Sequence, residues 1–175
     1  VVPSVIDLKS GEMRPFAKKE SADVARLCDA LDEVMVYERA GLPTDCPAES
    51  IQLHNWEAML ANTTKHCCVG PGNGFLLSKL VKMAATIVGG VDKLKERPIL
   101  SFTTCPVSPL TLIDECCEII MEAARTGSVV NILSMAMAGG TSPVTLAGAI
   151  ITANAEALSG LVMHQLRCKG APMIS

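Results

Sequence analysis

Aromatic residues are scarce in this sequence, at 3% of 175 residues against 49% hydrophobic residues overall. A core must therefore be built from Leu, Ile, Val, Ala and Met, whose compact side chains suit helices packed on a parallel sheet. Basic residues are not in excess either, because the formal net charge is -3. This balance argues against a nucleic acid as the main partner. The length is sufficient for one domain with a substantial core.

Long apolar runs and targeting signals are also missing. No apolar run reaches membrane-spanning length without a charged residue, a Gly or a Pro, and the first residues do not form a signal peptide. We therefore predict a cytoplasmic protein that makes no contact with a membrane. The sequence begins at Val1 rather than Met and stops inside a predicted strand. We expect both ends to be cut from a longer protein.

The eight cysteines lack the spacing of a metal site or a disulfide framework. No C-x-x-C or H-x-x-x-H pattern occurs, so a zinc site has no local support and we predict no metal. The pairs Cys67-Cys68 and Cys116-Cys117 lie inside apolar segments. Small secreted disulfide scaffolds are poor in core residues, unlike this chain. We predict that the cysteines are small buried side chains in a reducing compartment.

What is present is an alternation of strand and helix patterns. Residues 5–14 predict a hairpin that turns at Lys9–Gly11, and 41–47 form a Pro-rich connection. On the first helix, Val24 and Leu27 fall on the predicted apolar face. Alternating strands and helices with short loops predict a parallel sheet. The predicted helices cover 19–31, 49–62, 75–88, 109–125 and 143–168, and the predicted strands cover 65–69, 98–103, 128–136 and 171–174.

A short internal repeat supports this alternation. Ser108-Pro109-Leu110-Thr111-Leu112 returns as Ser142-Pro143-Val144-Thr145-Leu146, each time after a predicted strand. We expect each Ser to cap a helix whose first residue is the Pro. The predicted strands and helices make about three and a half βα units, whereas a complete barrel has eight such units in about 250 residues. The prediction is part of a TIM (β/α)8 barrel at 49–175, after a hairpin-helix segment and linker at 1–48, with a small open doubly wound sheet as the alternative.

The loops that follow parallel strands share one edge of the sheet, where ligands bind. These loops are 70–74, 103–108 and 138–142. The glycine pair in the last loop permits positive φ angles and close approach of a substrate. We therefore predict that substrate is bound by Thr103, Thr104, Gly139, Gly140, Thr141 and Ser142, together with His66 beside a predicted strand.

Catalytic residues stay unassigned. Cys105 is a candidate nucleophile, but no His lies near it in sequence to activate it. Glu156 lies in a helix of small residues, where a capping or packing role competes with a catalytic one. The segment at 70–74 lacks the Lys-Ser/Thr of a phosphate-binding loop, which favours a tight turn over a nucleotide site.

Several motif blocks resemble the trimethylamine methyltransferase (MttB-like) superfamily. They are ANTTK at 61–65, AGGTSPVTLAGAIITANAEALSGLVMHQL at 138–166, GAPMI at 170–174, and the segment 5–31 ahead of them. The resemblance extends over essentially the whole chain and places it in the central part of such a protein.

The resemblance implies a (β/α)8 barrel methyltransferase (EC 2.1.1.-), with methanogenesis as one setting of the family. Its members move a methyl group from trimethylamine, or from a quaternary amine such as glycine betaine, to the cobalt of a separate corrinoid protein. The corrinoid (cobalamin) is then carried by that partner, with no cofactor bound directly here. A homo-oligomer is expected as well. The pyrrolysine position that some members carry is expected beyond Ser175, and the fragment alone is expected to be inactive.

Two other functions remain open at this stage. A barrel lyase or aldolase would need a Schiff-base lysine at a strand end, and Lys65 at a strand start is the available residue. A truncated domain with only packing or interaction roles is the non-enzymatic alternative.

Overall fold

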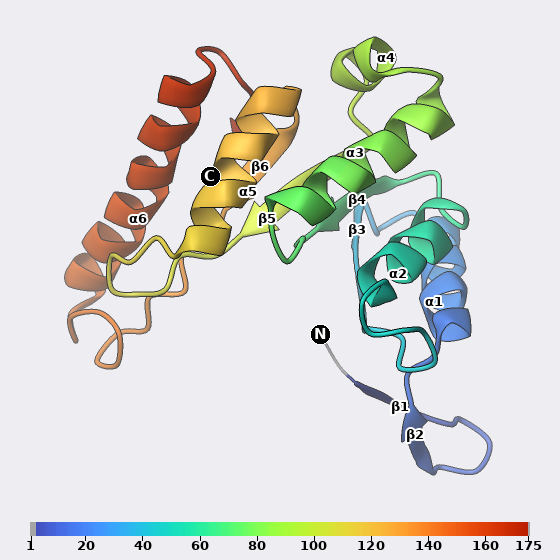
Figure 1. Cartoon of the computed structure of the whole chain (residues 1–175). Helices are drawn as coiled ribbons and strands as arrows, with labels where there is room; N and C mark the ends of the chain where they lie inside the picture. Colours follow the sequence, from blue (N-terminus) through green and yellow to red (C-terminus); the bar gives the residue numbers. More distant parts are fainter. Residues whose placement is uncertain (1–2, 175) are drawn as a thin grey trace. The chain divides into compact units, whose positions relative to one another are not determined.

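The computed structural model describes residues 3–174 and divides into two compact units, Val1–Val69 and Gly70–Ser175. Both units are mixed α/β, and strands with parallel partners alternate with helices in each (Figure 1). The predicted parallel pairing is therefore confirmed. The predicted boundary at 48/49 falls before the division between the units.

The first unit begins with an antiparallel pair of short strands, β1 (Ser4–Ile6) and β2 (Met13–Pro15), as predicted. Helix α1 (Lys18–Ala30) and helix α2 (Ile51–Leu60) follow. Strand β3 (Val36–Glu38) pairs in parallel with β4 (His66–Val69). The sequence prediction missed β3, because it has three residues and its flanks carry no alternating pattern.

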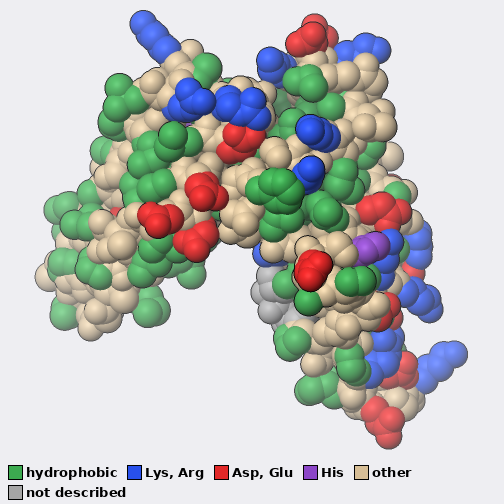
Figure 2. Space-filling view, in the orientation of Figure 1, with side chains coloured by type: hydrophobic (Ala, Val, Ile, Leu, Met, Phe, Trp, Pro, Cys, Tyr) green, Lys and Arg blue, Asp and Glu red, His purple; other side chains and the backbone are tan. Residues whose placement is uncertain are grey.

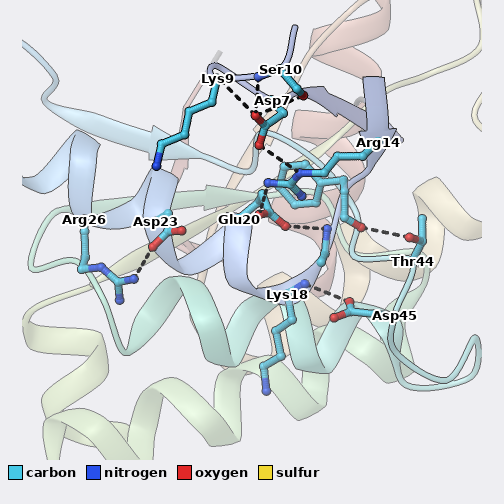
Figure 3. A network of polar contacts seen from close by, with 12 residues as sticks. Asp7, Lys9, Ser10, Arg14, Lys18, Glu20, Asp23, Arg26, Thr44 and Asp45 are labelled. Carbon is cyan, nitrogen blue, oxygen red and sulfur yellow. Dashed lines mark hydrogen bonds and ion pairs between the residues drawn. The ribbon is translucent and has the colours of Figure 1, made fainter. Parts of the chain in front are cut away.

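Polar contacts fasten the hairpin to the start of α1 (Figure 3). Asp7 accepts hydrogen bonds from the backbone N–H groups of Lys9 and Ser10, which closes the turn. Arg14 of β2 forms an ion pair with Glu20 at 2.8 Å. Glu20 also accepts from the Ala17 N–H at 2.9 Å. One of the free N–H groups at the start of α1 is thus satisfied by its own first turn.

The core of the first unit lies between α1 and α2. Trp56 and Ala25 are fully buried, and the buried Ser21 hydroxyl donates to Asn55 Oδ1 at 2.6 Å. The predicted apolar face of α1 was wrong at Leu27, which is 59% exposed. The buried face follows Ser21 and Ala25 because their small side chains let α2 approach closely.

The second unit contains three parallel strands in the order β5 (Leu100–Thr104), β6 (Val129–Ile132) and β7 (Met173–Ile174). Its helices are α3 (Gly74–Val88), α4 (Val91–Glu96), α5 (Asp114–Thr126) and α6 (Leu146–Arg167). The short helix α4 was not predicted. Asn73 caps α3 by accepting a hydrogen bond from the Leu76 N–H at 2.9 Å.

Helix α6 packs through a narrow stripe of three buried residues, Glu156, Gly160 and His164. A Cβ atom on Gly160 would lie 2.2 Å from Ile132 Cδ1 of β6, so this glycine permits the close approach of helix and strand. Most other apolar side chains of α6 are exposed, including Leu146, Ile151 and Leu166, and hydrophobic side chains gather over this helix in Figure 2. By length and composition α6 alone among the described helices could cross a membrane, and 11% of its apolar window is buried.

Two predicted helix starts were wrong. Helix α5 begins at Asp114 rather than Pro109, and α6 begins at Leu146 rather than Pro143. Thr145, not Ser142, caps α6 by accepting from the Gly148 N–H at 3.2 Å. The Ser-Pro of each copy consequently lies in a loop. A side chain further along the chain holds the first copy, and a tight turn precedes the second, as described below.

All eight cysteines are free thiols. Two are buried, Cys67 and Cys116, and burial raises the pKa of the Cys67 thiol to about 11. The predicted burial of the cysteines holds for these two and not for the exposed Cys105 and Cys168.

Candidate active site

The carboxyl ends of β5 and β6 lead into two loops that we call the first rim loop (105–113) and the second rim loop (133–145). Both lie at the same end of the second unit, near the starts of α5 and α6 (Figure 1). The strands are in register through Thr104 and Ile132. The Leu133 N–H donates to the Thr104 carbonyl at 3.0 Å. Parallel pairing therefore brings the two loops together, as the sequence predicted.

Glu156 of α6 connects the two rim loops. Its carboxylate accepts hydrogen bonds from Ser108 Oγ at 2.9 Å and from the Leu110 N–H at 2.9 Å in the first loop. It accepts a third bond from Ser134 Oγ at 2.5 Å in the second loop. The side chain is 2% exposed, so these bonds form away from bulk water, where their loss is costly.

The Glu156 carboxylate is held ionised by these donors. Burial raises its pKa, but the hydrogen bonds from Ser134, the Leu110 backbone and Ser108 outweigh burial, so the pKa lies below the ordinary value. All three donors are neutral. Within residues 3–174, no Lys, Arg or His lies within ion-pair distance of Glu156. The rim loops therefore surround a buried negative charge that no cation of the described chain balances.

Leu110 has a backbone conformation that Glu156 helps to hold. Its φ is +56°, in the left-handed region that a branched residue rarely adopts. The N–H of this residue donates to the Glu156 carboxylate. Such a conformation persists only when its surroundings hold it in place, and this charge-assisted bond is one such restraint.

The second rim loop contains a tight turn at 137–142. The N–H groups of Gly140, Thr141 and Ser142 all donate to the Met137 carbonyl, and the Met137 N–H donates to Thr141 Oγ1. Gly139 has φ +78°, as expected for the glycine pair, whereas Gly140 does not have a positive φ. A Cβ on Gly140 would meet only ordinary contacts, so the need for glycine is limited to position 139.

The predicted site residues on β5 point to opposite sides of the sheet. Thr104 is 6% exposed. Burial raises the pKa of the Cys116 thiol on α5, and a hydrogen bond with the Thr104 side chain opposes that rise. Thr104 therefore faces the helices. Thr103, next to it in the strand, faces the other side, in line with Asn131 of β6.

His66 lies at the beginning of β4, at the amino end of the strand. The candidate loops follow the carboxyl ends of strands, so His66 is placed away from the carboxyl edge of its own unit. Of the predicted site residues, Gly139, Gly140, Thr141 and Ser142 lie in the second rim loop. The substrate-binding role of every predicted site residue stays a prediction.

Ser142 has a buried hydroxyl without a hydrogen-bond partner. This differs from Ser108, its counterpart in the repeat, whose hydroxyl donates to Glu156. Cys105, considered as a nucleophile, is exposed at the start of the first rim loop. Among the residues that the structure describes, no group of three His, Cys, Asp or Glu side chains could hold a metal ion.

A groove of about 570 Å³ lies on the helix layer, along α5 from Asp114 to Glu122. Phe75 of α3, Arg167 and acidic residues of α5 line it, and Figure 2 shows carboxylates gathered over α5. These acidic residues include the exposed Glu118, whose carboxylate accepts a hydrogen bond from the Gly74 N–H at 3.3 Å. The groove is an open surface depression, and Lys79 lies 4.8 Å from the centre of the Phe75 ring.

Sequence reasoning missed Ser134 and the partners of Glu156. The available signal was the charge itself, because Glu156 is the one acidic residue of α6 and lies in a run of Ala and Gly. A carboxylate in such a helix is stable in a core only when donors meet it. Those donors come from loops distant in sequence, so the pairing could not be identified from the helix alone.

Comparison with known proteins identifies the family. The family model described as "Trimethylamine methyltransferase (MTTB)" matches residues 1–175. Trimethylamine methyltransferase MttB of Desulfitobacterium hafniense is 42% identical over 98% of this chain and 34% of its own length. MttB of Methanosarcina barkeri is 38% identical over 88% of this chain and 32% of its own length.

A third relative has a different named substrate. The glycine betaine methyltransferase of Desulfitobacterium hafniense is 33% identical over 75% of this chain and 28% of its own length. The chain thus spans about a third of the length of the curated relatives it matches. Because the family model covers the chain from end to end, the chain belongs to the trimethylamine methyltransferase (MttB) family.

Proposed function

We propose that the full-length protein containing this chain transfers a methyl group from a methylated amine to the cobalt of a corrinoid carried by a partner protein. The observation that carries the proposal is the family match over residues 1–175. Trimethylamine is the first substrate to test, since the trimethylamine relatives are more similar than the glycine betaine relative. The same proposal includes a cytoplasmic location and a homo-oligomer.

The proposed reaction asks for binding and orientation rather than for a nucleophile of this chain. The acceptor supplies the electron pair of the new bond to the methyl carbon, and the amine nitrogen keeps the pair of the bond that breaks. Trimethylammonium is thereby released as neutral dimethylamine, and glycine betaine as dimethylglycine. The chain has to hold the amine with one methyl group toward the acceptor. Rim loops with hydroxyl and glycine residues fit that task.

A (β/α)8 barrel is the architecture that we propose for the full-length protein. Parallel strands alternate with helices in the described part. The exposed apolar side chains of α6, such as Ile151 at 69% and Leu166 at 84%, form a surface that further elements of a barrel would cover. On this view the 175 residues supply part of the site, and the chain alone is inactive.

The lyase alternative is weakened by the position of Lys65. Its Nζ donates to the Leu31 carbonyl, and the residue precedes β4. A Schiff-base lysine belongs at the carboxyl end of a barrel strand, where the described residues of β4, β5 and β6 place no lysine.

The direct test is a methyl-transfer assay with the full-length protein, a cob(I)alamin acceptor and a panel of methylated amines. We expect methylcobalamin to form with trimethylamine or with a quaternary amine, and adding the corrinoid protein should raise the rate. If no amine in the panel methylates either acceptor, the proposed function is wrong.

A further inference from the structure

The hydrogen bonds of Glu156 connect the rim loops, but connecting them does not require a charged group. Neutral side chains could connect the rim loops, and an ionised carboxylate costs more to bury than an amide of the same shape. The structure nevertheless holds this carboxylate ionised, with three neutral donors and with no basic partner among residues 3–174. A bound cation would offset that cost.

Among its described residues, the second unit has no aromatic ring at the rim loops that could attract a cation in place of Glu156. Quaternary ammonium groups are often held by aromatic rings, but Phe102 is fully buried in the core. The other phenylalanine of this unit, Phe75, lines the groove on the helix layer and already has Lys79 over its ring. Among the described residues of this unit, attraction for a cation at the rim loops therefore falls to carboxylate charge.

We propose that Glu156 is a specificity-determining residue, whose buried charge makes the strand-end edge selective for the cationic form of a methylated amine. The inference rests on the proposed function and adds the source of the selectivity. Glu156 acts through its field rather than by contact, because its oxygens are occupied by Ser108, Leu110 and Ser134. At a site of low dielectric a unit charge acts strongly over several ångströms.

The variant Glu156→Gln separates charge from shape. The Gln oxygen can accept from the Leu110 N–H, and its amide can donate to a serine hydroxyl, which rotates to accept. The loop connection is thus largely kept while the charge is removed. The matched control is Glu118→Gln, which removes one exposed carboxylate from α5. That control also reports on the acidic groove, the competing cation site in this unit.

The experiment measures binding of tetramethylammonium and of tert-butanol, a neutral probe of similar size, to the full-length protein by calorimetry. We expect the wild type to prefer the cation, and Glu156→Gln to weaken tetramethylammonium binding about tenfold with tert-butanol binding unchanged. Glu118→Gln should bind both probes as the wild type does. Circular dichroism checks that each variant is folded.

Three results would overturn the inference. One is equal affinity of Glu156→Gln and wild type for tetramethylammonium, and another is a loss caused by Glu118→Gln instead. The third needs no variant, and so applies even where Glu156→Gln fails to fold: a wild type that binds tert-butanol as well as tetramethylammonium. Methyl transfer by the wild type combined with any of these results refutes the role of Glu156 and leaves the proposed function standing.

Discussion

The same Ser-Pro-x-Thr sequence occurs in both rim loops but forms different structures. In the first loop, Ser108 and Leu110 are bonded to Glu156. In the second loop the equivalent Ser142 has a buried hydroxyl without a partner, and Val144, the equivalent of Leu110, does not have a positive φ. The comparison shows that the repeated sequence does not set the loop conformation. One carboxylate on a helix further along the chain makes the difference.

Removing that carboxylate should have the largest effect. Glu156→Ala leaves the N–H of Leu110 and two serine hydroxyls without their acceptor, at a cost of about 3 kcal/mol in the free energy of unfolding. Hydrogen exchange should rise in 105–113 more than in 137–142, where the turn is closed by its own backbone. Thermal unfolding and hydrogen exchange of the full-length protein measure both effects. Equal exchange in the two loops would contradict the comparison.

The two serines of the repeat provide a matched pair. Ser108→Ala removes a hydrogen bond to a charged group and should destabilise the protein by about 1.5 kcal/mol. Ser142→Ala removes a buried hydroxyl that has no partner and should leave stability unchanged or raise it by up to about 1 kcal/mol, because the hydroxyl was buried without compensation. Chemical denaturation of both variants tests the difference. A loss at Ser142 as large as that at Ser108 would mean that both hydroxyls are anchored.

Gly139 and Gly140 test which position of the turn in the second rim loop requires glycine. Gly139→Ala places a Cβ on a residue with φ +78°, which costs about 1 kcal/mol. Gly140→Ala meets only ordinary contacts and serves as the control, with no measurable change expected. Unfolding midpoints of the two variants should differ accordingly, and equal midpoints would show that the turn does not depend on position 139.

The smallest predicted effect concerns pH and compares Glu156 with His164 on the same buried stripe of α6. Burial lowers the pKa of His164, and its Nε2 has no hydrogen-bond partner. The folded state therefore takes up a proton less readily than the unfolded state. His164 should contribute stability above its ordinary pKa of about 6.5, and this contribution should fall as the pH drops below that value.

The two groups titrate in different windows. Because the pKa of Glu156 is also lowered in the fold, its contribution is lost only at more acidic pH, below the ordinary Glu value of about 4.3. Unfolding measured against pH should show two separate declines. His164→Leu should abolish the decline near neutrality and leave the acidic one. A profile unchanged by that variant would show that His164 is not buried in the neutral form.

Much of the fold could be predicted from the sequence, because the spacing of hydrophobic residues and the turn residues are local signals. The hairpin, α1, α3 and the parallel order of strands followed from such signals. The start of α6 did not, because Thr145 and Ser142 are both good caps and the turn at 137–142 decides between them. The adjacency of the two rim loops was predicted, while their connection through Glu156 depends on contacts between residues distant in sequence.

The account depends on Glu156 holding the first rim loop and not the repeated segment of the second. The most direct measurement is a pair of double-mutant cycles in the full-length protein, combining Glu156→Ala first with Ser108→Ala and then with Ser142→Ala. We predict a coupling free energy of about 1 kcal/mol for Ser108 and additive effects within about 0.3 kcal/mol for Ser142. Additive effects at Ser108, or equal coupling at both serines, would contradict the claim that Glu156 holds only the first of the two repeated segments.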